Sequence, residues 1–152
     1  MRDIILIGGG GHCKSVIDII EEEGIYRIAG IVDISSKIGS AVLGYKVIAT
    51  DDELPLLAKE YRAFCITIGH TAVNNLRKGL CLRLMKLNVN LPVIKSPYAH
   101  VAKSALIKEG SVIMHHSVIN ANAQLGTCAI ANTGCIIEHD VEIGNYCHIG
   151  PG

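Results

Sequence analysis

Apolar and polar residues in the first half of the chain alternate in blocks that predict strands and helices by turns. The apolar run from Asp3 to Ile7 ends in four glycines, and residues 14–23 then carry aliphatic side chains at helical spacing. Further elements are expected as follows: strands over 27–33, 64–68 and 91–94, and a helix over 72–87 with leucines on one face. This order predicts a small doubly wound α/β domain with a mostly parallel sheet.

A capping box indicates where another helix begins. In Thr50-Asp51-Asp52-Glu53, the threonine hydroxyl and the glutamate carboxylate can each satisfy a free backbone amide at a helix start. We therefore expect a helix to begin at these residues.

Apolar residues in the second half recur every six positions instead. The positions that start at Val101 are almost all Ile, Leu or Val, and the positions four further on are all small or slim. The first set is Val101, Ile107, Ile113, Ile119, Leu125, Ala131, Ile137, Ile143 and Ile149; the second is Ala105, Ser111, Ser117, Ala123, Ala129, Cys135, Val141 and Cys147. This pattern suits a triangular prism of short strands, in which 18 residues complete one turn. The alternative is a β-sandwich, but the usual hairpin dipeptides do not occur.

Charge is distributed unequally between the two halves. Residues 1–96 hold most of the Lys, Arg, Asp and Glu, whereas residues 97–152 hold most of the histidines. This shift, beside Pro92 and Pro97, predicts two domains that cover 1–96 and 97–152. The formal net charge is zero, so we expect neither a nucleic acid nor a membrane as a partner.

The six cysteines contain no C-x-x-C pair, which argues against a zinc cluster and against a small secreted scaffold. We expect reduced, mostly buried thiols in a cytoplasmic protein. Apolar runs are too short for a membrane span, and the amino-terminal apolar stretch is too short for a signal peptide.

The glycines at 8–11 and the following histidine form the first candidate binding site. Glycine lets the backbone approach an anionic group, and a helix start adds free N–H donors and a positive dipole end. The motif matches G-x-G-x-x-G only in part, because Cys13 replaces the third glycine. Asp33, at the end of the second strand, could accept hydrogen bonds from a ribose or a uracil. We predict a nucleotide or nucleotide-sugar site; the alternative is a tight turn without a ligand. The candidate contacts are Gly10, Gly11, His12 and Asp33.

Two further candidates come from the third strand and the helix after it. Gly69-His70 ends the strand at the carboxyl edge of the sheet, where ligands of such folds gather. Arg77 could reach a phosphate from the following helix. The other basic residues of that helix are Lys78, Arg83 and Lys86, for which we favour a solvated helix face.

The densest polar chemistry of the repeat region is Glu138-His139-Asp140. A histidine between two carboxylates can be held in one tautomer and kept basic, as a general base near neutral pH requires. Such a base could take a proton from an amine or a hydroxyl as that group attacks an acyl carbon. The alternative is a surface histidine at a corner of the prism.

The chain resembles the bacterial sugar acetyltransferases, a family that includes sialic acid O-acetyltransferases and UDP-4-amino-sugar N-acetyltransferases. The matching segments are residues 5–12, 32–33 and 67–69, the hexads from Val101 onward, and residues 137–140. The hexads alone indicate only the broad hexapeptide acyltransferase fold, and the glycine-histidine turn ahead of them narrows it.

This resemblance implies a Rossmann-like nucleotide-sugar-binding domain followed by a left-handed parallel β-helix. It also implies a homotrimer, with acetyl-CoA between neighbouring prisms and the acceptor sugar held by the N-terminal domain. In this family His139 would be the base and Asp140 its carboxylate partner, while His148 would face the acetyl group of the donor. The resemblance implies no metal, and it leaves open which sugar is the acceptor and whether an amine or a hydroxyl is acetylated.

The prism of the family continues through further coils, so we expect these 152 residues to fold but to transfer acetyl groups poorly. One alternative is a non-catalytic module that binds a nucleotide sugar or forms a trimer. Another is an NAD(P)-binding protein, suggested by the glycine turn and Asp33. A metal site at the adjacent His115 and His116 is the least favoured interpretation.

Overall fold

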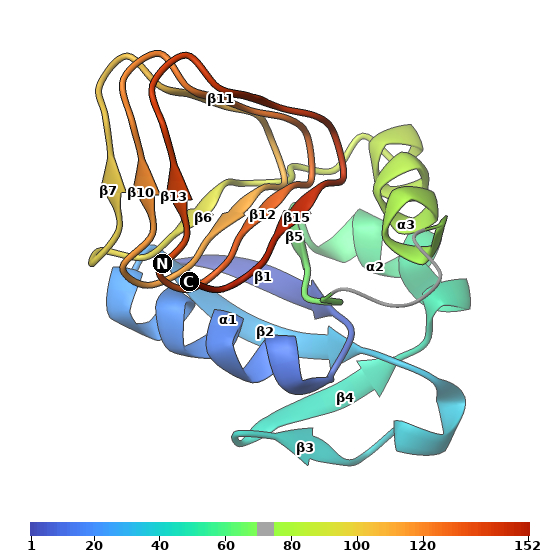
Figure 1. Ribbon diagram of the computed structural model, residues 1–152. Coiled ribbons are helices and arrows are strands. Elements are labelled where there is room, and N and C mark those ends of the chain that lie inside the picture. Colours follow the sequence, from blue (N-terminus) through green and yellow to red (C-terminus); the bar gives the residue numbers. More distant parts are fainter. Residues whose placement is uncertain (70–74) are drawn as a thin grey trace. The chain divides into compact units, whose positions relative to one another are not determined.

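The computed structural model describes residues 1–69 and 75–152, and the chain divides into two compact units, Met1–Leu91 and Pro92–Gly152. The first unit is a five-stranded sheet with helices, in the strand order β3-β4-β2-β1-β5 (Figure 1). Its strands are β1 (Arg2–Ile7), β2 (Tyr26–Val32), β3 (Ala41–Val42), β4 (Tyr45–Ala49) and β5 (Ala63–Ile66); its α-helices are α1 (Gly11–Glu23), α2 (Leu54–Glu60) and α3 (Asn75–Lys86), with short 3₁₀ turns η1 (Ser35–Lys37) and η2 (Asp51–Glu53).

The sheet is parallel except for the β3–β4 pair, as the sequence pattern predicts. The last four residues of β1 are fully buried, because a central parallel strand has both faces covered. Helix α1 packs against β2 and ends at Gly24, whose left-handed backbone lets its N–H bond to the carbonyl of Ile20. The chain adds β2 and β4 on one side of β1 and β5 on the other, so the strand order reverses between β1 and β5, and ligands of doubly wound folds bind at such a point.

The capping box at Thr50 is present, and η2 and α2 follow it as expected. The hairpin of β3 and β4 is an element that the sequence pattern missed. Its two loop residues, Leu43 and Gly44, both have positive φ, as a two-residue hairpin turn requires. The Leu-Gly pair is not one of the dipeptides by which such turns are usually recognised.

The leucine face predicted for the helix over 72–87 is partly wrong. Residues 72–74 of that prediction lie outside the described residues, and Leu76 is exposed. The buried face begins at Arg77 and continues through Leu80, Cys81 and Leu84. An arginine can occupy the end of an apolar stripe because its long aliphatic stem packs like a hydrocarbon.

The second unit is a coil of two-residue strands that forms three walls. The strands are β6 (Ile94–Lys95), β7 (His100–Val101), β8 (Leu106–Ile107), β9 (Val112–Ile113), β10 (Val118–Ile119), β11 (Gln124–Leu125), β12 (Ile130–Ala131), β13 (Ile136–Ile137), β14 (Glu142–Ile143) and β15 (His148–Ile149). The walls are β7-β10-β13, β8-β11-β14 and β6-β9-β12-β15, and all their pairs are parallel (Figure 1). Residue 118 pairs with residue 136 and residue 124 with residue 142, which confirms the repeat of 18 residues per turn.

The interior of the prism consists of the residues that the six-residue period selects. Its buried cluster is Ile113, Ile119, Ala123, Leu125, Ala129, Ala131, Cys135 and Ile137. The two buried serines at companion positions are satisfied: the Ser111 hydroxyl donates to the carbonyl of Gly126, and the Ser117 hydroxyl donates to that of Met114. The β-sandwich alternative is therefore excluded.

The strand predicted over 91–94 does not join the α/β sheet. Ile94 and Lys95 form β6, which pairs with β9 in the prism, and the two units meet between Leu91 and Pro92. The division thus lies a few residues before the predicted boundary at 96. The reason is that the first hexad of the coil begins ahead of the change in charge that marked the boundary.

Five of the six cysteines are buried and Cys147 is exposed, and none of the six forms a disulfide. Burial raises the pKa of the Cys65 thiol to about 12, which makes it inert near neutral pH. Among the described residues, none of the helices has the length and apolar character needed to cross a bilayer.

Candidate functional site

The first two glycines of the 8–11 turn are required by the packing of the first unit. Gly8 has φ +102°, and a Cβ there would lie 2.3 Å from Cγ1 of Ile68. A Cβ on Gly9 would lie 2.9 Å from a carboxylate oxygen of Asp33. These two glycines therefore shape the turn itself.

The last two glycines of the turn meet no such constraint. A Cβ on Gly10 or Gly11 would have no atom within 4 Å, and both residues are exposed. Gly10 caps α1 without a side-chain hydrogen bond, and the first turn of α1 carries no acidic residue. Open backbone at the positive end of a helix dipole is the arrangement by which such turns bind anions.

Asp33 closes the glycine turn from the end of β2. One carboxylate oxygen accepts from the Gly9 N–H at 2.8 Å and from Lys37 Nζ at 2.8 Å, and the other accepts from the Ile34 N–H at 2.7 Å. Burial works to raise the pKa of Asp33, but Lys37 and the two amides outweigh it, so the pKa lies below its ordinary range. Both carboxylate oxygens of Asp33, which we expected to bind a ribose or a uracil, therefore already accept hydrogen bonds from groups of the protein itself.

The structure brings His12 and Gly69 together at the carboxyl edge of the sheet. A Cβ on Gly69 would lie 3.2 Å from Cβ of His12, so this histidine, in the first turn of α1, packs on the backbone of the loop after β5. Thr67 supports this edge, since its hydroxyl lies 3.0 Å from the Ile7 carbonyl and 2.6 Å from the Gly8 carbonyl. His70, the other residue predicted here, lies outside the described residues.

Arg77 differs from the other basic residues of α3. It is 7% exposed, whereas Lys78 and Lys86 are exposed, as expected of a solvated face. Its charge acts to lower the pKa of the Cys65 thiol, although burial dominates that pKa. The guanidinium therefore acts on β5, whose carboxyl end lies at the same sheet edge as Gly69.

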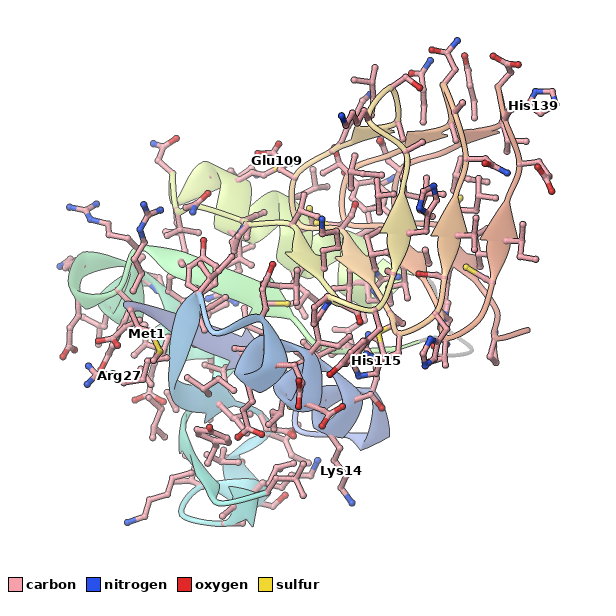
Figure 2. The ribbon with its side chains drawn as sticks, turned by 90° about the vertical axis from the view of Figure 1, so that its left-hand side faces the viewer. Met1, Lys14, Arg27, Glu109, His115 and His139 are labelled. Carbon is pink, nitrogen blue, oxygen red and sulfur yellow. The ribbon has the colours of Figure 1, made fainter. Side chains whose placement is uncertain are left out.

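His139 and Asp140 form a hydrogen-bonded pair at an exposed corner of the prism, between β13 and β14. Nδ1 of His139 lies 2.7 Å from Oδ2 of Asp140, and the two side chains are 74% and 66% exposed. Figure 2 shows the imidazole of His139 at the outer edge of the coils. Because a carboxylate only accepts, the proton of the neutral ring lies on Nδ1, and Nε2 presents its lone pair to solvent.

The carboxylate makes this histidine more basic. The hydrogen bond and the charge of Asp140 raise the pKa of His139 above its ordinary range, and the charge of Glu138 adds to the effect. The pKa of Asp140 is correspondingly lowered, first by His139 and then by Asn122. The pair has the orientation and the basicity of a general base with its carboxylate partner.

Two asparagines that the sequence analysis did not select support the Glu138-His139-Asp140 corner from the preceding coil. Asn120 Nδ2 donates to Glu138 at 2.8 Å, and Asn122 Nδ2 donates to Asp140 Oδ1 at 3.1 Å. Each asparagine stands 18 residues before its partner. Counting back the length of one coil from each carboxylate in the sequence would have identified both asparagines.

His148 lies on a different wall of the same prism from the corner of His139. It belongs to β15 in the β6-β9-β12-β15 wall, and its Nε2 lies 2.9 Å from Asn132 Nδ2. Along the chain, strand β14 of the β8-β11-β14 wall lies between the corner of His139 and β15. The structure therefore does not bring the predicted base and the predicted donor contact together within one chain.

A groove of about 310 Å³ runs along the outside of the β8-β11-β14 wall, which begins directly after the His139 corner. It is lined by Lys108, Gln124, Leu125, Gly126, Glu142, Ile143 and Gly144. Gly126 is required here by coil stacking, since a Cβ would lie 2.6 Å from the backbone of Gly144 and Asn145. The two glycines leave this part of the wall without bulky side chains.

The pair His115-His116 is part of a ring cluster with Tyr98. Nδ1 of His115 lies 2.6 Å from the hydroxyl of Ser96, which also accepts from the Tyr98 N–H. Among the described residues, neither this cluster nor any other brings together three or more His, Cys, Asp or Glu side chains that could hold a metal ion.

The chain is similar in sequence and structure to known proteins that acetylate sugars. The family model of the PglD N-terminal domain matches residues 3–83, more than half of the chain. The structure of a histidine-to-alanine mutant of GDP-perosamine N-acetyltransferase from Caulobacter crescentus, in complex with CoA and GDP-perosamine, is 34% identical with a TM-score of 0.91; the match covers 99% of this chain and 70% of that one. The chain belongs to the PglD family of bacterial sugar acetyltransferases.

Two further relatives support membership in this acetyltransferase family. The acetyltransferase domain of PglB from Neisseria gonorrhoeae, in complex with acetyl coenzyme A, is 32% identical with a TM-score of 0.84, over 99% of this chain and 71% of that one. UDP-N-acetylbacillosamine N-acetyltransferase from Bacillus subtilis is 34% identical over 120 residues, which are 75% of this chain and 52% of that protein. The chain spans between 23% and 66% of the length of three curated relatives that it matches.

These findings confirm the recognition of the acetyltransferase family and the fold class predicted from the hexads. The first unit is the Rossmann-like domain, and the second is the left-handed parallel β-helix. The individual site residues stay predictions, which the geometry above makes testable.

Proposed function

We propose that this chain acts as an acetyl-CoA-dependent acetyltransferase on an amino or hydroxyl group of a nucleotide sugar, with His139 as the general base. The observation that carries the proposal is the 2.7 Å contact between His139 Nδ1 and Asp140 Oδ2. In the neutral ring this contact holds the proton on Nδ1 and leaves the lone pair of Nε2 on an exposed side chain, where an acceptor can approach it.

In this mechanism, Nε2 of His139 takes a proton from the acceptor as its nitrogen or oxygen attacks the thioester carbonyl carbon. The carbon–sulfur bond then breaks, and the imidazolium returns the proton to the departing thiolate. The products are the acetylated sugar and free CoA. Asp140 stabilises the imidazolium that forms between these two steps.

The relatives favour an amine as the acceptor. The Caulobacter and Bacillus proteins are both named N-acetyltransferases, and one of them was solved with a nucleotide-linked sugar. An amine must be neutral to attack, so a base near neutral pH suits it. The sugar and its nucleotide base stay open.

The nucleotide sugar is assigned to the glycine turn of the first unit. Gly10 and Gly11 are open at the start of α1, so a diphosphate can approach the backbone amides closely. His12 and Gly69 would line the same edge, with Arg77 as the nearby positive charge. Asp33 would contribute chiefly by holding the turn in shape, since both of its oxygens already accept hydrogen bonds.

The donor site is assigned to two copies of the chain. His148 lies on a different wall from the His139 corner, so one acetyl group can meet both only if a neighbouring copy supplies one of them. This geometry supports the homotrimer that the family resemblance implies. The groove along the β8-β11-β14 wall is a candidate path for the extended arm of the donor.

Acetyl transfer by the full-length protein, from acetyl-CoA to nucleotide-linked amino sugars, tests the proposal. Removal of a general base should lower the rate about 10²- to 10⁴-fold, so we expect a loss of this size for His139→Ala. The matched control is His116→Ala, another exposed histidine at a corner of the same prism. A His139→Ala protein that keeps the parent rate would refute the assignment.

A second measurement separates the enzyme from the binding-module and NAD(P) alternatives. A ligand that binds the native state raises the melting temperature, and at a given concentration a tighter ligand raises it more. We expect stabilisation by acetyl-CoA and by UDP- or GDP-linked sugars. Stabilisation by NAD alone would favour the dinucleotide-binding alternative, and stabilisation by nucleotide sugars without acetyl-CoA would favour the non-catalytic module.

A further inference from the structure

A column of polar side chains leads to the His139 corner from the two preceding coils. Ser104, Asn122 and Asp140 stand 18 residues apart at the same turn of successive coils. The Ser104 hydroxyl accepts from the Asn122 N–H at 3.0 Å, and the Asn122 amide donates to Asp140 Oδ1 at 3.1 Å. The other oxygen of Asp140 accepts from His139. The column therefore ends on the proposed base.

From this column we infer that Asn122 is a positioning residue, which fixes the carboxylate of Asp140 so that its second oxygen meets Nδ1 of His139. The inference rests on the proposed function in one respect only, namely that His139 is the base. The hydrogen-bond geometry on which it stands is independent of any acetyl transfer.

The need for such a residue follows from exposure. Asp140 and His139 are adjacent in sequence at an exposed corner, and an exposed ion pair gains little by itself because water competes for both partners. A second hydrogen bond to the same carboxylate restricts its rotation. Asn122 supplies that bond from a neighbouring coil, whose own turn is fixed by the stacking of the walls.

The backbone at both positions agrees with this role. Asn122 has φ +63° and Asp140 has φ +62°, so both occupy the left-handed region that Asn and Asp tolerate better than most residues. The Asp140 N–H also donates to the carbonyl of Ala121 at 3.1 Å. Two stacked left-handed turns thus place the amide of one directly on the carboxylate of the next.

Asn120 offers an internal comparison. Its amide donates to Glu138, the carboxylate on the other side of His139, at 2.8 Å. Glu138 and Asp140 are the charged groups that act on the imidazole, but only Asp140 is hydrogen-bonded to it. Removal of the Asn120 amide should therefore leave the tautomer of the ring unchanged and shift its pKa less than removal of the Asn122 amide does, although the chemical change is nearly the same.

The test is an NMR titration of the His139 ring in the full chain. Asn122→Gly removes the amide and keeps a residue that accepts positive φ. We expect the pKa of His139 to fall toward its ordinary range, and its nitrogen shifts to move from the Nδ1–H tautomer toward the Nε2–H form. His116→Gly, at an equivalent left-handed turn of another corner, should leave both signals unchanged. Asn120→Ala should leave the tautomer unchanged and shift the pKa less than Asn122→Gly does.

Three results would overturn the inference: an unchanged His139 titration in Asn122→Gly, a rise in its pKa, or an equal change in either control. A rise would mean that the amide only withdraws charge from Asp140 and does not orient it. In the full-length enzyme we expect acetyl transfer by Asn122→Gly to slow about threefold, because the base is present but less often aligned. If the NMR signals change as expected while His139→Ala stays fully active, the positioning role stands and the proposed function fails.

Discussion

The two units of this protein present chemistry in opposite ways. In the first unit the candidate site is main chain: an open helix start at Gly10 and Gly11, held by Asp33 and Thr67 beneath it. In the second unit it is side chain: an imidazole and a carboxylate that stand 74% and 66% exposed at a corner. The first unit thus offers backbone groups whose position is set by side chains packed against them. The second unit offers side chains that project from a regular coil.

This difference predicts how each unit responds to substitution. A main-chain site depends on where side chains are absent, so an added methyl group can destroy either the fold or the binding, according to its place. A corner site depends on which side chains are present, so it can lose its chemistry while the frame stays intact. Matched substitutions in the two units can separate these effects.

The largest effect is expected at the glycine turn. Gly8→Ala forces a Cβ to within 2.3 Å of Ile68 at φ +102°, and should destabilise the first unit by about 3 kcal/mol. Gly10→Ala meets no atom within 4 Å and should leave the melting temperature unchanged. Denaturant unfolding measures the stability of both variants. A binding assay measures their affinity for a nucleotide sugar. If Gly10→Ala bound the nucleotide sugar as tightly as the parent, the anion site would lie elsewhere.

The interior of the prism should tolerate little added volume. Ala123 is fully buried at a companion position of the hexads, so Ala123→Leu should cost about 2 kcal/mol. Ala121→Leu, the same change two residues earlier at an exposed turn, is the control for stability. Equal unfolding free energies for the two variants would contradict the assignment of the core.

A smaller effect is expected when the partner of the base is neutralised. Asp140→Asn removes the negative charge that helps to raise the pKa of His139 and weakens the hydrogen bond to its ring, so the rate should fall about tenfold with the folded state unchanged. Only the neutral imidazole is a base, so the parent rate should fall as the pH drops through the pKa of His139. This pKa lies above the ordinary imidazole value of 6.5. In Asp140→Asn this fall should move to lower pH, as a pH–rate profile would measure. If the rate of Asp140→Asn fell at the same pH as that of the parent, His139 would be excluded as the titrating group.

The smallest effect is expected at Asp33. Its folded-state pKa is lower than the ordinary 3.8, so its charge stabilises the fold above that value, and this stabilisation is lost as the pH falls through the lower folded-state value. Asp33→Asn should therefore lower the unfolding free energy by about 1 kcal/mol at pH 7. The difference should shrink below about pH 4, which unfolding curves at several pH values would reveal. A constant difference would assign the loss to shape and not to charge.

The sequence predicted the prism more completely than the α/β unit. A six-residue period repeats nine times, so errors at single positions such as Ala131 do not hide it, and the interior follows directly. The α/β unit has no such repetition. The β3–β4 hairpin was missed because its Leu43-Gly44 turn lacks a recognisable signal, and the stripe of α3 was misplaced because it includes Arg77.

The candidate site was predictable in its residue types but not in its connections. His139 and Asp140 are neighbours in sequence, so their contact could be anticipated. The engagement of Asp33 by Lys37 and the Gly9 amide could not, because it depends on how the loop after β2 folds back. Asn122 was overlooked because nothing in its local sequence distinguishes it from other turn residues; only the length of a coil connects it to Asp140.

The 18-residue register has a consequence for how the protein tolerates insertions and deletions. Gain or loss of one whole coil before His139 would carry the histidine along the axis by one strand spacing, about 4.8 Å, yet leave it on the same corner. Gain or loss of a single residue would instead turn interior side chains outward in every coil that follows. Insertions and deletions in this region should therefore be tolerated in multiples of a full coil. Each such change would move the imidazole along the axis of the prism.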